Sequence, residues 1–236
     1  MNKMKLFRIK KIICNSGFTK SIIDKEYGVD SQVLYPPVDI KDIKIKRKEN
    51  NILFVGRFSQ LKQSKNQHVL IEAFQKLFDG GISDWKLILV GGVEVGSKDY
   101  LISLKDDIGN YPIEIIGSPD FKTLKDLYGK AKIFWSAVGY GEDEKKSPEK
   151  VEHFGITVVE AMAAGCIPIV YNAGGYKEII TVQNGFLWRE IDELVSITND
   201  LTKKPYSVWK GLIANGVNDA NKYSYDVFSK EFEKLI

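Results

Sequence analysis

The stretch 149-EKVEHFGITVVEAMAAGCIPIV-170 decides how this chain folds. It predicts a tight turn at Gly155, a helix over 155–164 that is apolar nearly all round, and then a buried strand over 166–172. Two carboxylates frame the helix. Glu152 lies just before the turn, whereas Glu160 lies within the buried segment and therefore needs a partner: a cation, a hydroxyl group or a ligand.

Strand-like and helix-like segments alternate from residue 51 onward. Short apolar runs bounded by glycine alternate with amphipathic segments, which is typical of repeated strand–helix–strand units. We therefore predict an α/β fold with a doubly wound parallel sheet, in which ligands bind at the carboxyl ends of the strands. The expected strands are 51–56, 85–92, 112–117, 131–137, 166–172 and 184–188, and the expected helices between them are 64–78, 98–107, 121–130 and 155–164.

Residues 1–50 follow a different pattern. A strand is expected in "KIICNS" and a short helix ended by Gly28 in "FTKSIIDKEYG". This piece has too little apolar sequence to form a domain alone. We interpret it as an appendage or the remnant of a neighbouring domain, and 51–236 as the α/β domain with helices at its C-terminal end.

Composition limits the class of protein. The 236 residues carry 34 Lys+Arg against 31 Asp+Glu, and this near balance argues against a nucleic-acid-binding surface. Two cysteines, Cys14 and Cys166, give no disulfide framework and favour a reducing, cytoplasmic compartment. Apolar runs fall short of the length that a membrane span needs. The basic opening over 1–16 allows weak peripheral contact with a cytoplasmic membrane face, or is simply solvated.

The segment "VGRFSQLKQSKNQ" places two cations, Arg57 and Lys62, on a loop that leads into a helix. This arrangement suits a phosphate or diphosphate, although a solvated basic loop has the same composition. A second anion site is expected where the backbone amides of Gly155, Ile156 and Thr157 open their helix.

The two glutamates allow two interpretations. Glu144 and Glu152 are also eight residues apart, so the spacing alone proves little, and a helix cap with a core ion pair is a possible structural role. Gly174 and Gly175 follow the fifth strand, where a turn can bring amides near a substrate. Asp-x-Asp is absent, so a carboxylate-bound metal is not expected. Gly-x-Gly-x-x-Gly is absent as well, which disfavours a nicotinamide enzyme.

Taken in order, these segments resemble the C-terminal, nucleotide-sugar-binding domain of family-4 retaining glycosyltransferases of the GT-B fold, which has two Rossmann-like halves. The resemblance covers residues 51 to about 188, and "IICNSGFTKSIIDKEYG" (12–28) with "VLYPPVDI" (33–40) resembles the segment that enters this domain. It rests on "ILFVGRF", "LIEAF", "LILVGG", "LKDLYGKAKIFW", "EHFGITVVEAMAAGCIPIV", "GGYKEI" and "NGFLW".

The resemblance implies roles for single residues. Arg57 and Lys62 would grip the diphosphate of the donor, helped by the helix start at Gly155, Ile156 and Thr157. Glu152 would contact the transferred sugar near its reacting carbon and is the implied catalytic residue. Glu160 would hold the ribose hydroxyls. Transfer would retain the anomeric configuration and use no metal.

The resemblance covers one half of such an enzyme. We therefore expect residues 1–50 to be a remnant or linker from an acceptor-binding domain, supplied by a longer protein or by a separate chain. The polypeptide alone should bind nucleotide-sugar but be inactive. A non-catalytic module that binds a nucleotide or phosphosugar is the alternative. "EHFGI" and "GYGEDE" resemble mannosyltransferases that build lipid-linked or surface glycans, but the sequence leaves the donor base, the sugar and the acceptor open.

Overall fold

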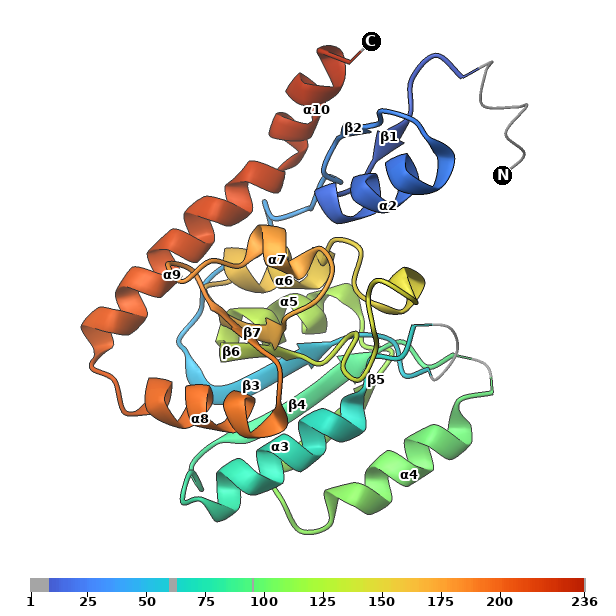
Figure 1. Ribbon diagram of the computed structural model, residues 1–236. Coiled ribbons are helices and arrows are strands. Elements are labelled where there is room, and N and C mark those ends of the chain that lie inside the picture. The colour runs from blue at the N-terminus through green and yellow to red at the C-terminus, as the bar shows by residue number, and fades with distance from the viewer. Residues whose placement is uncertain (1–8, 60–62, 95, 236) are drawn as a thin grey trace.

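The computed structural model describes residues 9–59, 63–94 and 96–235, and its centre is a six-stranded sheet (Figure 1). All pairs of neighbouring strands are parallel, in the order β5-β4-β3-β6-β7-β8. The predicted parallel sheet is therefore confirmed. Its strands are β3 Glu49–Val55, β4 Lys86–Gly91, β5 Ile113–Gly117, β6 Ala131–Ser136, β7 Ile167–Tyr171 and β8 Phe186–Trp188.

Helices cover both faces of the sheet, so the fold is doubly wound as predicted (Figure 1). Each strand sends alternate side chains to opposite faces, and each face packs on its own set of helices. On β3, Ile52 and Phe54 pack with α3 and α8, whereas Leu53 packs with α5 and α6. The helices are α3 Gln67–Asp79, α4 Lys98–Ile108, α5 Phe121–Lys130, α6 Ile156–Ala163, α7 Tyr176–Ile179, α8 Ile191–Thr202, α9 Tyr206–Ala220 and α10 Tyr225–Glu233.

The strand order changes direction beside β3. From β3 the chain adds β4 and then β5 on one side, and afterwards β6, β7 and β8 on the other. The connections that leave the carboxyl ends of β3 and β6 therefore turn away from each other and leave a crevice between them. In open α/β sheets this switch point is where ligands bind.

The N-terminal segment forms a small unit of its own. β1 (Ile13–Cys14) pairs in parallel with β2 (Gln32–Val33), and α2 (Gly17–Tyr27) connects them. The strand expected in "KIICNS" thus pairs locally instead of joining the large sheet. Figure 1 shows this unit at one end of the molecule, beside α10. Gly28 ends α2 with φ +65°, as predicted.

Glu178, at α7, joins the N-terminal unit to the sheet domain. Its carboxylate accepts hydrogen bonds from the backbone amides of Gly17 (2.8 Å) and Phe18 (2.6 Å) and from the Tyr35 hydroxyl (3.0 Å). A carboxylate at the start of α2 also faces the positive end of the helix dipole. Burial, together with the Glu178 carboxylate, raises the pKa of Tyr35 to about 12. The unit is therefore docked by charge-assisted contacts.

Neither cysteine forms a disulfide in the structure. Cys14 and Cys166 are buried free thiols, as the apolar context of Cys166 predicts. Burial raises the pKa of the Cys166 thiol.

Among the described residues, none of the helices is both long enough and apolar enough to pass through a lipid bilayer. The basic opening lies largely in residues 1–8, outside the described residues.

Candidate functional site

A cavity of about 410 Å³ opens at the switch point of the sheet. It lies where β3 and β6 end, and the start of α6 closes one side. Five segments contribute to it: the N-terminal segment, the loop after β3, the loop after β6, the loop before α6 with the start of that helix, and α7. Its lining residues are Asn15, Pro36, Val55, Gly56, Arg57, Gln63, Lys65, Val138, Glu152, His153, Phe154, Gly155, Ile156, Thr157 and Tyr176.

Glu152 and Lys65 form the ion pair of this cavity. The Lys65 ammonium lies 3.1 Å from Glu152 Oε2, and the two side chains are only 13% and 18% exposed. Lys65 Nζ also donates to Gln63 Oε1 at 2.9 Å, and the Gln63 amide donates to the backbone carbonyl of Val151. The loop after β3 is thus fastened to the loop that carries Glu152. The predicted catalytic carboxylate lies in a polar, half-enclosed cavity with a cation beside it.

Lys65 is the site residue that the sequence analysis missed. Lys62 was selected as the second cation, but it lies outside the described residues, so its predicted role is not tested. Lys65 stands directly before Asn66, the residue that caps α3. That position was a usable signal, because a lysine at a helix entry after a strand-end loop faces the carboxyl end of the sheet.

Arg57 lines the same cavity but is more exposed, at 61% of its side chain. Its guanidinium donates to Glu94 Oε1 at 2.5 Å. The pKa of Glu94 is lowered, chiefly by a hydrogen bond with Ser59 and then by the Arg57 charge. An exposed ion pair of this kind is weak, so Arg57 can turn toward an anion at little cost.

The start of α6 forms the wall opposite these cations. Gly155 has φ +116°, and a Cβ there would lie 2.7 Å from the Tyr176 ring, so only glycine fits. The turn lets α6 begin inside the cavity, and the first amides of a helix lack intrahelical acceptors. The backbone at Gly155, Ile156 and Thr157 therefore lines the cavity at the positive end of the helix dipole, a position suited to an anion.

Gly174 and Gly175 support the Glu152 loop from behind. A Cβ on Gly174 would lie 2.0 Å from the carbonyl oxygen of Glu152, and one on Gly175 would lie 2.4 Å from that of His153. The amide of Gly175 donates to the Glu152 carbonyl (2.8 Å), and the amide of Gly174 donates to the Glu144 carboxylate (2.9 Å). Both amides were expected near a substrate, yet in this structure each has an acceptor within the protein.

Glu160 lies apart from Glu152. It is not among the residues that line the cavity, and Tyr128 donates its hydroxyl to Glu160 Oε2 at 2.8 Å. Burial raises the pKa of Glu160, although the hydrogen bond from Tyr128 opposes this shift. The sequence predicted that Glu160 needs a cation, a hydroxyl group or a ligand as its partner, and the structure supplies the hydroxyl group of Tyr128.

His153 connects the N-terminal unit with the cavity. Its ring stacks on Phe18 of α2 with centroids 6.4 Å apart, and its Nε2 lies 3.2 Å from the carbonyl oxygen of Pro148. Asn15, which precedes α2, lines the same cavity. The N-terminal unit is thus part of the cavity wall.

Curated proteins with similar sequences include several mannosyltransferases. The chain is 31% identical over 204 residues to the GDP-Man:Man(3)GlcNAc(2)-PP-Dol alpha-1,2-mannosyltransferase of Xenopus laevis, which covers 77% of this chain and 39% of that protein. It is also 31% identical over 199 residues to the O-antigen chain mannosyltransferase RfbU of Salmonella typhimurium, covering 81% and 50%. The chain therefore spans half or less of the length of these two relatives.

Solved structures agree on the fold. Anabaena Alr3699/HepE in complex with UDP and glucose superimposes with a TM-score of 0.78 at 20% identity, covering 100% of this chain and 67% of that one. Sucrose-phosphate synthase from Thermosynechococcus elongatus gives 0.77 at 19% identity, with 99% and 59% covered. The fold is that of one Rossmann-like half of the GT-B glycosyltransferases.

The comparison with protein families agrees with the sequence relatives and with the solved structures. Residues 37–203, well over half of the chain, match the family described as Glycosyl transferases group 1. The match contains the sheet from β3 to β8, the loop with Arg57 and Lys65, and the Glu152 loop with α6. The chain belongs to the Glycosyl transferases group 1 family.

Proposed function

We propose that this chain is the donor-binding, C-terminal domain of a family-4 retaining glycosyltransferase and holds a nucleotide-diphosphate sugar in the cavity beside Glu152. One observation carries the proposal. Two cations, a helix start and a half-buried carboxylate converge on a cavity at the switch point of the sheet. A sugar diphosphate needs these groups together: positive charge for its phosphates and a carboxylate at the sugar.

In this scheme Lys65 and Arg57 face the diphosphate, with the backbone of Ile156 and Thr157 on the opposite side. When the bond between sugar and phosphate breaks, negative charge grows on the leaving diphosphate. Preorganised cations and amides stabilise that charge where it develops. Lys62 stays a candidate for the same role. The reaction requires no metal in this proposal, because these groups supply the positive charge.

Glu152 is the proposed catalytic residue. A glycosyl group in transfer resembles an oxocarbenium ion, which a nearby carboxylate stabilises. The ion pair with Lys65 keeps Glu152 oriented before the donor arrives. Glu160 is proposed to hold the ribose hydroxyls, since a carboxylate can accept more hydrogen bonds than the one from Tyr128. Gly174 and Gly175 would act through the backbone by keeping the Glu152 loop in place.

GDP-mannose is the donor that we propose first, because relatives that share most of this chain's length are named as mannosyltransferases, some with GDP-Man in the name. The acceptor would be a glycan or a lipid-linked sugar. It would be held by an N-terminal domain, of which residues 1–50 are the remnant or linker, while 51–236 form the donor domain. We place the activity in the cytoplasm, at the membrane face if the basic opening contacts lipid.

Calorimetry with GDP-mannose, UDP-glucose and ADP-glucose tests the donor proposal. Arg57→Ala with Lys65→Ala should weaken binding of the preferred donor by about a hundredfold, because each lost charged contact contributes on the order of 1.5–3 kcal/mol. Lys98→Ala with Lys105→Ala removes two exposed lysines of α4 and is the matched control. Equal binding by the wild type and the Arg57–Lys65 double variant would disprove the diphosphate assignment.

A non-catalytic nucleotide- or phosphosugar-binding module is the second candidate. It is favoured by one observation, that the Glu152 carboxylate is already paired with Lys65 at 3.1 Å, which a purely structural role of Glu152 would also explain. Glu152→Gln separates the two candidates once the acceptor-binding part is present. A catalytic domain loses sugar transfer but keeps nucleotide binding, whereas a binding module leaves transfer by the complex unchanged.

A further inference from the structure

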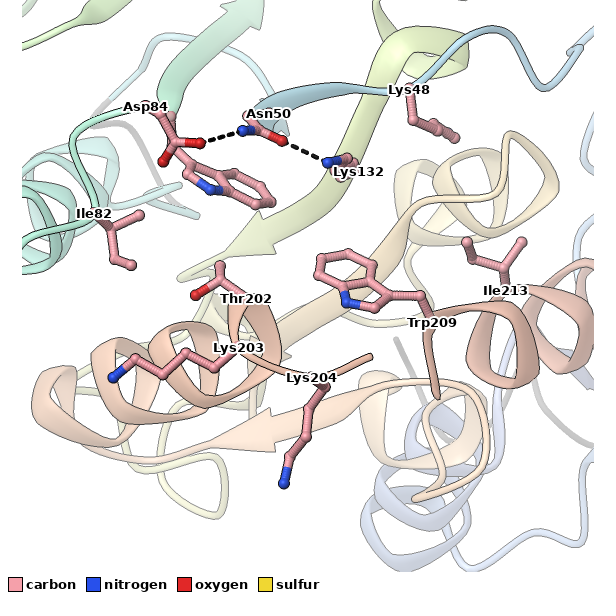
Figure 2. A pocket seen from close by; sticks show the side chains of 11 residues that line it. Lys48, Asn50, Ile82, Asp84, Lys132, Thr202, Lys203, Lys204, Trp209 and Ile213 are labelled. Carbon is pink, nitrogen blue, oxygen red and sulfur yellow. Dashed lines mark hydrogen bonds between the residues drawn. The ribbon is translucent and has the colours of Figure 1, made fainter. Parts of the chain in front are cut away.

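A second cavity lies at the opposite end of the same sheet. Its volume is about 430 Å³, and it is bordered by the amino ends of β3, β4 and β6 and by the connection between α8 and α9 (Figure 2). It shares none of its lining residues with the cavity at Glu152. They are Lys48, Asn50, Ile82, Asp84, Trp85, Lys132, Thr202, Lys203, Lys204, Trp209 and Ile213.

Two indole rings form the apolar part of this cavity. Trp85 is 5% exposed and stacks on the half-buried Trp209, with centroids 6.3 Å apart and an angle of 24°. The Lys132 ammonium lies over both rings, 5.5 and 5.9 Å from their centroids. Because the rings are in stacking range of each other, a ligand ring has no room between them. It would pack on the part of Trp209 that lines the cavity, where Ile82 and Ile213 supply the other aliphatic lining side chains.

A chain of polar groups faces the indoles. Lys132 donates to Asn50 Oδ1, and Asn50 Nδ2 donates to Asp84 Oδ2 at 2.6 Å. Figure 2 shows this chain along one side of the cavity, with Trp209 across from it. The groups offer an ammonium donor and a carboxylate acceptor side by side. Such a pair suits a ligand with several hydroxyl groups, each of which donates and accepts.

The charge of the cavity is unbalanced. Lys48, Lys132, Lys203 and Lys204 line it against a single carboxylate, Asp84. The ion pairs found within the described ranges include many exposed lysines, such as those of Lys76–Asp192 and Lys41–Asp226, but none of these four. Lys48 is instead bonded to the backbone carbonyls of Ala131 and Ala164. Lys203 and Lys204 are exposed at the edge of the cavity, and in Figure 2 their ammonium groups point outward, away from Trp209. Such long exposed side chains can turn toward an anionic group of a ligand.

We propose that this cavity is a second ligand site, distinct from the donor cavity, and that it binds a phosphorylated sugar. A pyranose has apolar C–H faces that pack on the indole of Trp209, and hydroxyl groups that reach Asp84 and Lys132. Its phosphate pairs with Lys203 and Lys204. Inorganic phosphate would leave the indole unused, and a neutral sugar would leave the lysines unused. The proposal does not depend on which nucleotide-sugar binds beside Glu152.

Calorimetric titration of the 236-residue chain with mannose 6-phosphate is the test. We expect binding at one site per chain, at least about tenfold tighter than with mannose or with inorganic phosphate. Trp209→Ala, and separately Lys203→Ala with Lys204→Ala, should each weaken binding about tenfold or more. The lysine variant changes only exposed side chains, so it remains informative if Trp209→Ala fails to fold.

Two controls separate this site from the donor cavity. Lys65→Ala, and the α4 pair Lys98→Ala with Lys105→Ala, should leave mannose 6-phosphate binding unchanged. The Lys203–Lys204 double variant should bind GDP as the wild type does. The proposal is overturned if mannose 6-phosphate does not bind or if Lys65→Ala abolishes its binding. It is equally overturned if phosphate alone or GMP binds this cavity as tightly.

Discussion

The two ends of the central sheet carry opposite kinds of cavity. At the carboxyl ends, polar groups are fastened to one another: Lys65 pairs with Glu152, and Gly175 holds the Glu152 backbone. At the amino ends, two indoles and four lysines with a single carboxylate, Asp84, line the cavity. The same strands thus support a preorganised polar site at one end and an aromatic, positively charged site at the other.

Helix polarity explains part of this difference. In a parallel α/β sheet, helix N-termini gather at the carboxyl ends of the strands and helix C-termini at the amino ends. The former suit anions, which is the role proposed for the start of α6, and the latter favour lysines such as Lys203 and Lys204 just after α8. The helix dipole therefore accounts for cations at the amino end. The half-buried indole of Trp209 in the lining beside them is the reason for proposing a ligand site at this end.

The backbone of the carboxyl-end site should tolerate least change. Gly174→Ala would place a Cβ 2.0 Å from the Glu152 carbonyl at φ +57°, so we expect the free energy of unfolding to fall by about 2–4 kcal/mol. Nucleotide binding should weaken as well, since the Glu152 loop must move. Urea denaturation and calorimetry measure the two effects.

Gly211→Ala is the matched control for that change. Gly211 lies within α9 near the other cavity, and a Cβ there meets nothing within 4 Å. Alanine at an unhindered helix position should raise stability by about 0.5–1 kcal/mol. If both substitutions changed stability alike, the close approach of Gly174 to Glu152 would not be a constraint on the site.

The second largest effect on the free energy of unfolding is expected from the ion pair between Lys65 and Glu152. Lys65→Met leaves Glu152 half-buried beside an apolar group, so we expect a loss of about 1–2 kcal/mol of unfolding free energy. A double-mutant cycle with Glu152→Gln should give a coupling free energy of about 1 kcal/mol, measured by urea denaturation. The exposed pair Lys76–Asp192 is the control, with coupling near zero. Equal coupling in both pairs would mean that Lys65 and Glu152 are no more preorganised than surface charges.

Much of the fold was predictable because its pattern is local. Each strand of the large sheet is a short apolar run, and each predicted helix has an apolar face, so elements such as β4 and α4 fall within a few residues of the expected ranges. The pairing of β1 with β2 was not predicted, because short strands of two residues leave no periodicity to detect.

Predicting the site was harder because it depends on contacts between distant residues. Glu152 and the start of α6 were found from the local turn at Gly155. Lys65 was missed because its loop holds several lysines, and only the fold shows which of them reaches Glu152 across 87 residues. The second cavity was not predicted from the sequence, because Trp85 and Trp209 come from segments with no shared motif.

Glu160→Gln has the smallest expected effect on the free energy of unfolding. It tests whether the second glutamate belongs to the polar site at the carboxyl ends of the strands. Burial raises its pKa above the ordinary value of a glutamate side chain. A carboxyl group with a raised folded-state pKa favours folding only while protonated, and this contribution is lost as the pH rises through that pKa. At pH 7 the ionised Glu160 therefore costs stability. Glu160→Gln should raise the free energy of unfolding there by about 1 kcal/mol or less.

The gain from Glu160→Gln should shrink as the pH falls to about 4, where the carboxyl group is largely protonated in both states. Urea denaturation at both pH values measures it, with the exposed Glu149→Gln as the control. A loss of stability at pH 7 would show that the protein stabilises the ionised form of Glu160. Glu160 would then belong with the paired charges of Lys65 and Glu152. A gain that fades with pH, together with weaker nucleotide binding, fits a carboxylate kept ionised at a cost in stability because a ligand uses it.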